Sequence, residues 1–270
     1  MTQIAPLTDR GVLVLHGVDR VTFLNGLISQ DVTKVTTEQP LYGCLLTPQG
    51  KYFADFFIIM RDDAIMLDVP LVRKDAVLQR LNMFVLRSKV TIADVSSDHK
   101  IYAVWNGTIA NGYADPRYSG LGQRVISTSI LDTNTILDVY HTWRLQHGVA
   151  DVTDFEIERT ALLEANLDQL HGIAWEKGCY MGQELTARTH YRGLIKKRLL
   201  PFQFDGDAPV YDTPIMIGND TIGHTRSTSN GYGLALMKME FADAAWGGSA
   251  TVNGMDITIL KPEWFELKVA

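Results

Sequence analysis

The residues best suited to chemistry lie at positions 177–184, where the sequence reads KGCYMGQE. Gly178 is an acceptable helix N-cap and Gly193 is of the type favoured just past a helix, so a helix is predicted between them. Cys179 would then lie in the first turn, where unpaired backbone N–H groups, the helix dipole and the nearby Lys177 favour the thiolate. Because a thiolate attacks electrophiles and binds metals, Cys179 is the candidate catalytic residue.

The expected helix is polar on most sides, which favours a helix that lines a cleft or meets a partner. Two structural interpretations stay open. A free cysteine is often a small buried hydrophobe, and Glu184 with Arg188 forms an i,i+4 pair that can simply support a helix. Residues 188–198 carry five Lys or Arg in eleven positions, a charge suited to an anionic ligand.

Composition limits the class of protein. The chain has 270 residues, 46% of them hydrophobic, which suffices for two or three compact units. Its net charge of −6 argues against coating of nucleic acid over the whole surface. Cys44 and Cys179 are the only cysteines and show no zinc-site spacing, so we expect a reducing compartment and no resident metal. The first ten residues lack an export pattern, and no apolar run approaches the roughly 20 residues that span a bilayer, so we expect a soluble protein with no membrane partner.

Hydrophobic periodicity predicts helices on one face of a mainly antiparallel sheet in the first part of the chain. We expect helices near residues 18–29, 72–87 and 135–147, and strands at 12–15, 41–47, 51–60, 64–69, 89–93, 101–105 and 124–127. Pro48-Gln49-Gly50 predicts a hairpin turn, and Asp115-Pro116-Arg117 a turn whose Arg ties loops together.

The pattern changes at residue 199. Short strands alternate there with Gly, Pro, Asn and Asp turns, which predicts a small closed or nearly closed β domain. Its expected strands are 199–204, 215–217, 221–227, 233–239, 249–252 and 257–261. The helix after Gly178 directly precedes this domain, so we expect the functional cleft where domains meet.

These motifs resemble a known family. The string KGCYxGQE, the sequence LEANLD at residues 163–168, and Ala187-Arg188 with Arg192-Gly193 are similar to the signature of the YgfZ-type folate-binding proteins. Those proteins are relatives of the glycine-cleavage T protein, an aminomethyltransferase. Shorter similarities at residues 12–31, 46–55, 114–124 and 231–236 extend the resemblance over nearly the whole chain.

The resemblance implies an α+β fold: a T-protein-like three-domain cloverleaf with ferredoxin-like α/β units and a C-terminal β-barrel. The implied domains are a discontinuous folate-binding core of residues 1–42 and 114–197, an inserted ferredoxin-like domain of residues 43–113, and a barrel of residues 198–270. The implied cofactor is tetrahydrofolate. The implied role is the assembly or repair of iron-sulfur clusters, including those of enzymes that modify transfer RNA.

Matching positions give the implied folate site. Glu164 matches the carboxylate with which T proteins grip the pterin ring, and a carboxylate can accept the amino group and the ring N–H of a pterin together. The other cofactor-binding candidates are Asn166, Asp55, Lys177, Tyr180, Gln183, Glu184, Arg188 and Arg192. The arginines suit the carboxylates of a folate tail, although a solvated basic face is an equal alternative. Asp55 could likewise lie on the polar face of an exposed strand.

Three functions remain open: an accessory factor, a transferase, and a pure binding or scaffold module for transfer RNA or a protein client. T proteins carry two successive Asp residues where this chain has Ala54-Asp55, and orienting an amine leaving group needs a positioned acid or base. The first hypothesis is therefore a tetrahydrofolate-binding accessory factor. In it, Cys179 accepts a sulfur or a one-carbon adduct, holds the iron of a transient cluster together with a partner's ligands, or acts as a redox-sensitive latch. The alternative is a tetrahydrofolate-dependent aminomethyl or methyl transferase.

The implied partners are folate and iron-sulfur client or assembly proteins, and direct binding of transfer RNA is left open. The expected location is the bacterial cytoplasm, or the mitochondrial matrix if a transit peptide has been removed.

Overall fold

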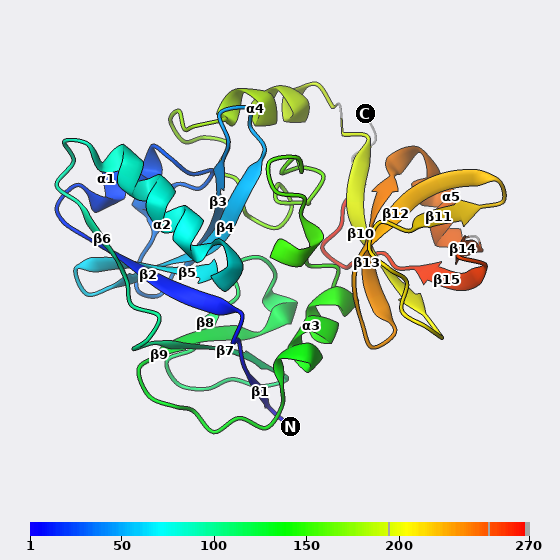
Figure 1. Cartoon of the computed structure of the whole chain (residues 1–270), viewed down its shortest axis with the longest axis horizontal. Coiled ribbons are helices and arrows are strands. Elements are labelled where there is room, and N and C mark those ends of the chain that lie inside the picture. Colours follow the sequence, from blue (N-terminus) through cyan, green and yellow to red (C-terminus); the bar gives the residue numbers. More distant parts are fainter. Residues whose placement is uncertain (194, 248, 268–270) are drawn as a thin grey trace.

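The computed structural model describes residues 1–193, 195–247 and 249–267 (Figure 1). Two antiparallel sheets are followed by a closed barrel. The predicted core domain includes position 194, and the predicted barrel domain includes 248 and 268–270; these positions lie outside the described residues.

The first sheet has five strands in the order β3-β4-β5-β2-β6. The strands are β2 (Arg10–His16), β3 (Leu41–Leu46), β4 (Tyr52–Arg61), β5 (Ala64–Pro70) and β6 (Thr91–Asp94). Successive side chains of a strand point to opposite faces. In β2, Leu13 and Leu15 therefore join a core with helices α1 (Arg20–Asn25) and α2 (Leu71–Val85), while Val12 and Val14 join a second core on the other face.

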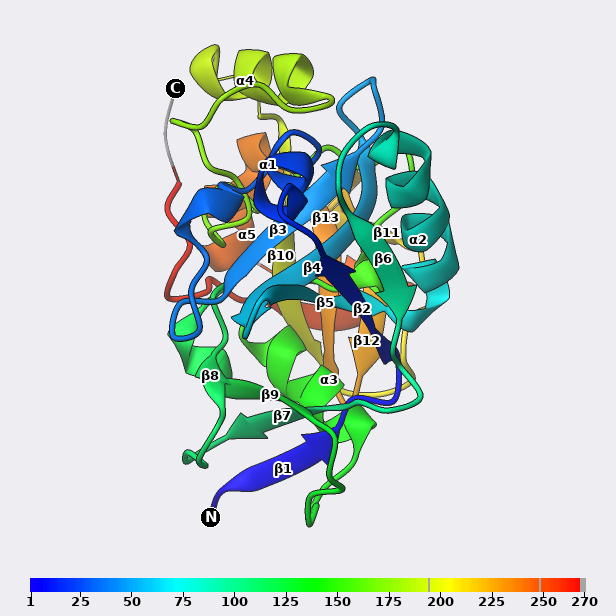
Figure 2. The same ribbon diagram turned by 90° about the vertical axis from the view of Figure 1, so that its left-hand side faces the viewer.

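The second sheet has four strands in the order β1-β7-β9-β8 and lies below the first in Figure 2. The strands are β1 (Gln3–Pro6), β7 (Lys100–Trp105), β8 (Tyr113–Ala114) and β9 (Gln123–Ser127). Helix α3 (Leu137–Gln146) lies between the two sheets and the barrel (Figure 1). Short 3-10 helices are η1 (Val32–Lys34), η2 (Ser119–Leu121) and η3 (Val152–Asp154).

Six strands close the C-terminal barrel in the order β10-β13-β12-β11-β14-β15. The strands are β10 (Lys197–Phe204), β11 (Pro214–Ile217), β12 (Asp220–Ser229), β13 (Tyr232–Lys238), β14 (Ala250–Val252) and β15 (Met255–Ile259). The barrel has its own apolar core and also contains η4 (Met239–Phe241) and α5 (Ala242–Gly247). The predicted closed β domain is confirmed.

The helices predicted at 72–87 and 135–147 are present as α2 and α3. The helix predicted at 18–29 is shorter: α1 ends at Asn25, because Ile28 pairs with Leu45 of β3 as an isolated bridge. The predicted domain boundary between residues 42 and 43 falls inside β3, and β2 shares a sheet with β3 to β6. The first two predicted units thus share one sheet.

Buried charges connect the two sheets. The Asp68 carboxylate on β5 accepts from Arg10 Nε of β2 at 2.6 Å and from Arg124 Nη2 of β9 at 2.5 Å. All three residues are at least nine-tenths buried, and the Arg124 guanidinium lies 3.9 Å from the ring centroid of Phe57. A buried carboxylate needs such partners, because an unpaired buried charge lowers the free energy of unfolding by about 3–5 kcal/mol. This ion network therefore fixes the second sheet on the first.

We expect Arg124→Met to lower the free energy of unfolding by about 3–5 kcal/mol, because Asp68 loses a charged partner in a buried place. Urea unfolding followed by tryptophan fluorescence measures the change. Arg159→Met is the control: this side chain is 83% exposed, so its substitution should be nearly neutral. A loss below about 1 kcal/mol in Arg124→Met would show that the network does not hold the sheets together.

Candidate functional site

Helix α4 (Gln183–Tyr191) begins later than predicted. Its N-cap is Gly182, with φ 79°, so the prediction that Gly178 caps the helix and that Cys179 lies in its first turn is wrong. The cause is a contact with the hairpin turn between β3 and β4. A Cβ on Gly182 would lie 2.5 Å from the Thr47 carbonyl oxygen, and only glycine adopts this left-handed conformation so close to another backbone. Gly193 follows the helix with φ 62°, as predicted.

Cys179 is exposed and lies in a segment without regular secondary structure. The interpretation of Cys179 as a buried hydrophobe is therefore wrong, and so is the argument that a helix start activates it. Cys44 is the buried cysteine, with 0% exposure, and burial raises the pKa of its thiol. Cys179 is thus the thiol that a reagent or a partner can reach.

The Lys177 ammonium is bound inside the protein. Nζ donates to the backbone oxygens of Asn25, Ile28 and Gln30 at 2.7, 2.8 and 2.7 Å. Burial lowers the pKa of Lys177 to about 8, and the charge of nearby Asp31 acts in the opposite direction. Since an ammonium has three N–H donors, these three acceptors use all of them. Lys177 therefore serves as an internal clamp rather than as an open ligand for a cofactor.

The other motif residues divide between the interior and the surface. Tyr180 is buried, its ring centroid lies 5.0 Å from Lys177 Nζ, and burial raises its pKa. Gln183 Oε1 accepts from the Tyr180 amide at 3.3 Å. Glu184, Arg188 and Arg192 are exposed. Within the described part of the chain Glu184 and Arg188 form no ion pair, so both remain available to a partner or ligand.

Asp55 lies in the interior of the first sheet. Its carboxylate is 0% exposed, accepts from the Tyr52 and Tyr42 hydroxyls at 2.5 and 3.2 Å, and lies 4.0 Å from Arg10 Nη1. Burial raises the pKa of Asp55, although Arg10 and the Tyr52 hydroxyl act in the opposite direction. The interpretation of Asp55 as the polar face of an exposed strand is wrong. Its oxygens face two phenols.

Asn166 and Glu164 lie in the segment that contacts β10, the first strand of the barrel. Asn166 is buried with φ 60°; its Nδ2 donates to the Leu199 carbonyl at 2.6 Å and its Oδ1 accepts from Arg198 Nη1 at 3.0 Å. Glu164 is half-buried, and its Oε2 accepts from the Ala161 amide at 3.2 Å. Both side chains make contacts that the local fold needs.

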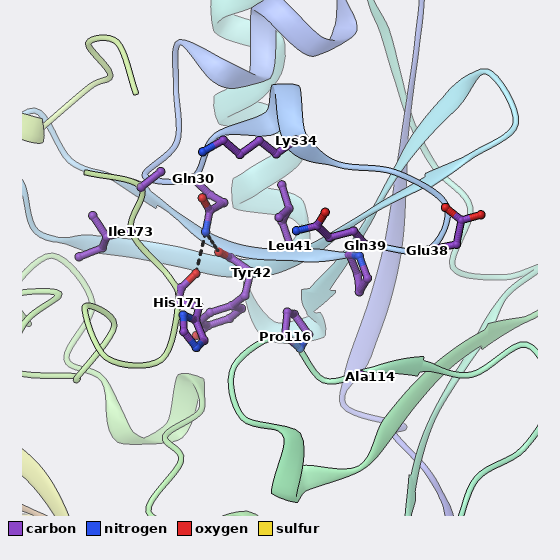
Figure 3. Close-up of a pocket in the computed structure, with 12 residues that line it drawn as sticks. Gln30, Lys34, Glu38, Gln39, Leu41, Tyr42, Ala114, Pro116, His171 and Ile173 are labelled. Carbon is purple, nitrogen blue, oxygen red and sulfur yellow. Dashed lines mark hydrogen bonds between the residues drawn. The ribbon is translucent and has the colours of Figure 1, made fainter. Parts of the chain in front are cut away.

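A cavity of about 520 Å³ opens beside the edge strand β3 (Figure 3). It is lined by Gln30, Lys34, Glu38, Gln39, Pro40, Leu41, Tyr42, Ala114, Pro116, His171, Ile173 and Ala174. We call it the β3 pocket. Gln30 Nε2 donates to the carbonyl oxygens of Tyr42 and His171, at 3.2 and 2.6 Å, and so joins two of its walls. None of the ten predicted site residues lines it, but Tyr42 separates it from Asp55.

No sequence motif predicted this pocket. Its residues come from three separated segments, 30–42, 114–116 and 171–174. The predicted turn at Asp115-Pro116-Arg117 does contribute one wall, and its expected role is confirmed. Arg117 Nε donates to Asp115 at 3.0 Å and Nη1 to the Ala150 carbonyl at 3.4 Å, which ties two loops together.

Two kinds of feature are absent from residues 1–193, 195–247 and 249–267. No three or more His, Cys, Asp or Glu side chains are grouped there so that they could hold a metal ion. No helix in these ranges has the length and apolar character needed to cross a membrane.

Comparisons with known proteins agree on fold and family. The CAF17 C-terminal beta-barrel domain family matches residues 196–267. An iron-sulfur cluster assembly factor IBA57 homologue, mitochondrial, from Mycosarcoma maydis is 35% identical over 75% of this chain and 57% of its own length. The homologue from Aspergillus oryzae is 32% identical over 87% of this chain and 70% of its own length.

Among solved structures, the crystal structure of the glycine cleavage system aminomethyltransferase T from Bartonella henselae superimposes with a TM-score of 0.74. The match covers 98% of this chain and 86% of that one at 13% identity. This similarity shows the fold alone, and it confirms the predicted T-protein-like α+β architecture with a C-terminal barrel.

The two glycines of the motif allow a matched test of where α4 begins. Gly182→Ala should destabilise the protein by more than about 1 kcal/mol, because it combines a left-handed φ with a clash against backbone. Gly178→Ala should be nearly neutral, since nothing lies within 4 Å of its added Cβ. Thermal unfolding of both variants measures the difference. Equal losses of stability in the two variants would contradict the assignment of Gly182 as the N-cap.

Proposed function

This chain belongs to the family of iron-sulfur cluster assembly factors that includes the mitochondrial IBA57 homologues, and on that premise we propose that it takes part in iron-sulfur cluster assembly. The chain spans 57% of the first of these relatives and 70% of the second. The observation that carries the proposal is the exposed Cys179 thiol, which lies in the most specific motif of the sequence.

The thiol suits a transient contact with a cluster. Cysteine thiolates are the usual ligands of iron-sulfur clusters, and a stable cluster needs several of them. Cys44 is fully buried, so Cys179 supplies one ligand and a partner protein must supply the others. The exposed Arg188 on the following helix and the exposed Arg192 at its C-cap suit the negative charge of a thiolate-bound cluster. Assembly proteins or cluster-containing clients are the partners that fit this chemistry.

We further propose that tetrahydrofolate binds in the β3 pocket. The pocket volume of about 520 Å³ lies within the range typical of small-molecule sites. Leu41, Ile173 and Pro116 offer apolar walls to a ring system. Glu38 offers a carboxylate for ring N–H groups. Lys34, whose side chain is 62% exposed and whose ammonium lies 3.7 Å from Asp31, offers a positive charge for tail carboxylates. Asp55 and Glu164, the carboxylates implied by the T-protein resemblance, already bind protein groups.

The alternative, a folate-dependent aminomethyl or methyl transferase, draws support from the fold shared with aminomethyltransferase T. The site argues against it. Ala54 stands where T proteins have a carboxylate, and Asp55 is enclosed by the phenols of Tyr42 and Tyr52. Protonating or orienting an amine leaving group requires an acid or base within hydrogen-bond reach of the substrate.

The named relatives are mitochondrial proteins, so of the two expected locations we propose the mitochondrial matrix rather than the bacterial cytoplasm. Support for enzymes that modify transfer RNA would follow from the supply of their clusters. It requires no direct contact with transfer RNA.

We expect Cys179→Ala to abolish rescue of cluster-enzyme activity in cells that lack the endogenous protein, because the exposed ligand is lost. Activity of a four-iron enzyme in extracts is the measurement. Cys44→Ala is the matched control and should retain rescue, since Cys44 is buried away from partners. Full rescue by Cys179→Ala, at equal protein level, would refute the role of this thiol.

Calorimetry with tetrahydrofolate tests the pocket. Lys34→Met and Glu38→Gln should each weaken binding by about tenfold, the loss of one charge-assisted hydrogen bond. Lys196→Met is the control, because Lys196 is exposed and does not line the pocket. If Glu164→Gln abolishes binding while both pocket variants bind normally, the site lies elsewhere. If the wild-type protein does not bind tetrahydrofolate, the folate part of the proposal fails.

A further inference from the structure

Two segments far apart in the chain are paired between the β3 pocket and Cys179. Residues 25–30 begin at the last residue of α1, and residues 171–177 precede the thiol. Ser29 Oγ donates to the Gly172 carbonyl at 2.6 Å, and the Ala174 amide donates to the Ser29 carbonyl at 2.9 Å. Lys177 Nζ completes the pairing with its three bonds to carbonyls of the first segment. We call residues 25–30 and 171–177 the paired segments.

One end of the paired segments forms a wall of the pocket. Gln30, His171, Ile173 and Ala174 all line it, and Gln30 Nε2 holds the His171 carbonyl at 2.6 Å (Figure 3). A ligand that fills the pocket therefore contacts both segments. Its binding energy favours the arrangement in which the two segments are paired.

The other end of the paired segments, at Lys177, leads into the loop that carries the Cys179 thiol. Cys179 is two residues after Lys177 and is itself exposed. Gln30 belongs to both ends, because its side chain faces the pocket while its carbonyl oxygen accepts from Lys177 Nζ at 2.7 Å. The path from the pocket to the thiol thus runs through Gln30, one hydrogen bond, the Lys177 side chain and the two peptide units between Lys177 and Cys179.

The Lys177 contact is suited to transmit a positional change. Three carbonyl oxygens from three different residues converge on one ammonium, which fixes Nζ more narrowly than a single bond would. The side chain is half-buried and has no ion-pair partner within 4.0 Å among the described residues. Its position therefore depends on the geometry of residues 25–30.

We propose that Lys177 is a positioning residue that couples occupancy of the β3 pocket to the position of the Cys179 thiol. Ligand binding tightens the paired segments, and Lys177 passes this constraint to the loop that carries the thiol. The choice of tetrahydrofolate as pocket ligand rests on the proposed function; the coupling between pocket and thiol does not.

The first test measures the rate of Cys179 alkylation by iodoacetamide, read by intact mass, with and without saturating tetrahydrofolate. Cys44 is fully buried, so a single adduct reports Cys179. In the wild-type protein, we expect the ligand to slow alkylation by about fivefold, the lower end of usual coupling between sites. In Lys177→Met, the ligand should bind, as calorimetry will show, without changing the rate.

Lys196→Met is the matched control, since it removes an exposed lysine near the motif and leaves the clamp intact. It should keep the full ligand effect. An undiminished effect in Lys177→Met, or tetrahydrofolate binding without any change of the wild-type rate, would overturn the proposal. If Lys177→Met does not fold, judged by circular dichroism, Lys177→Gln replaces it. That variant keeps two N–H donors without the charge, and the ligand effect should fall.

The second test needs no ligand. Gln30→Ala removes the pocket-side amide that holds His171 and Tyr42. It should change the alkylation rate of Cys179 in the wild-type background and leave the rate unchanged in the Lys177→Met background. Equal effects in both backgrounds would show that Lys177 carries no coupling. If tetrahydrofolate fails to bind, the folate proposal falls and this double-mutant cycle alone decides the coupling.

Discussion

The Asp68 carboxylate, placed between two arginines at the contact of the two sheets, is the constraint on which the rest of the structure depends. A carboxylate without solvent needs charged partners, and Arg10 and Arg124 reach it from strands of different sheets. A similar buried contact leads to the barrel: Arg144 of α3 binds Asp154, which accepts from Ser227 of β12. These ionic contacts set the position of the strands that carry Tyr42 and Asp55, and hence of the pocket beside them.

The centre of this chain is filled by its own side chains. Asp151 lies beside Arg10; burial alone would raise its pKa, but Arg10 and the guanidiniums of Arg144 and Arg117 lower it below its ordinary value. Asp55 is sealed by two phenols in the same region. The architecture shared with aminomethyltransferase T therefore does not carry an open central carboxylate with it. The β3 pocket lies at the edge of the sheet, and the exposed Cys179 thiol lies in a loop before α4.

Local patterns predicted the elements better than the site. Periodicity located α2, α3 and the barrel, because each buries an apolar face that repeats along the sequence. The capping rule placed the start of α4 four residues too early, because Gly178 and Gly182 are both acceptable N-caps. Only the contact of Gly182 with Thr47 decides between them. Lys177 was expected to bind a cofactor, but the carbonyls that bind it come from residues about 150 positions earlier. No local rule reveals such partners.

The contact between Gly50 and Gly182 has a mechanical consequence. A Cβ on Gly50 would meet the Gly182 carbonyl oxygen at 2.7 Å, and one on Gly182 would meet the Gly50 Cα at 3.0 Å. The backbone of the hairpin tip therefore contacts the backbone at the start of α4 directly. A protein that docks on α4 and displaces it would therefore displace the hairpin tip directly. Strand β4 continues from this tip to the buried Asp55 carboxylate, so such a displacement would also reach Asp55.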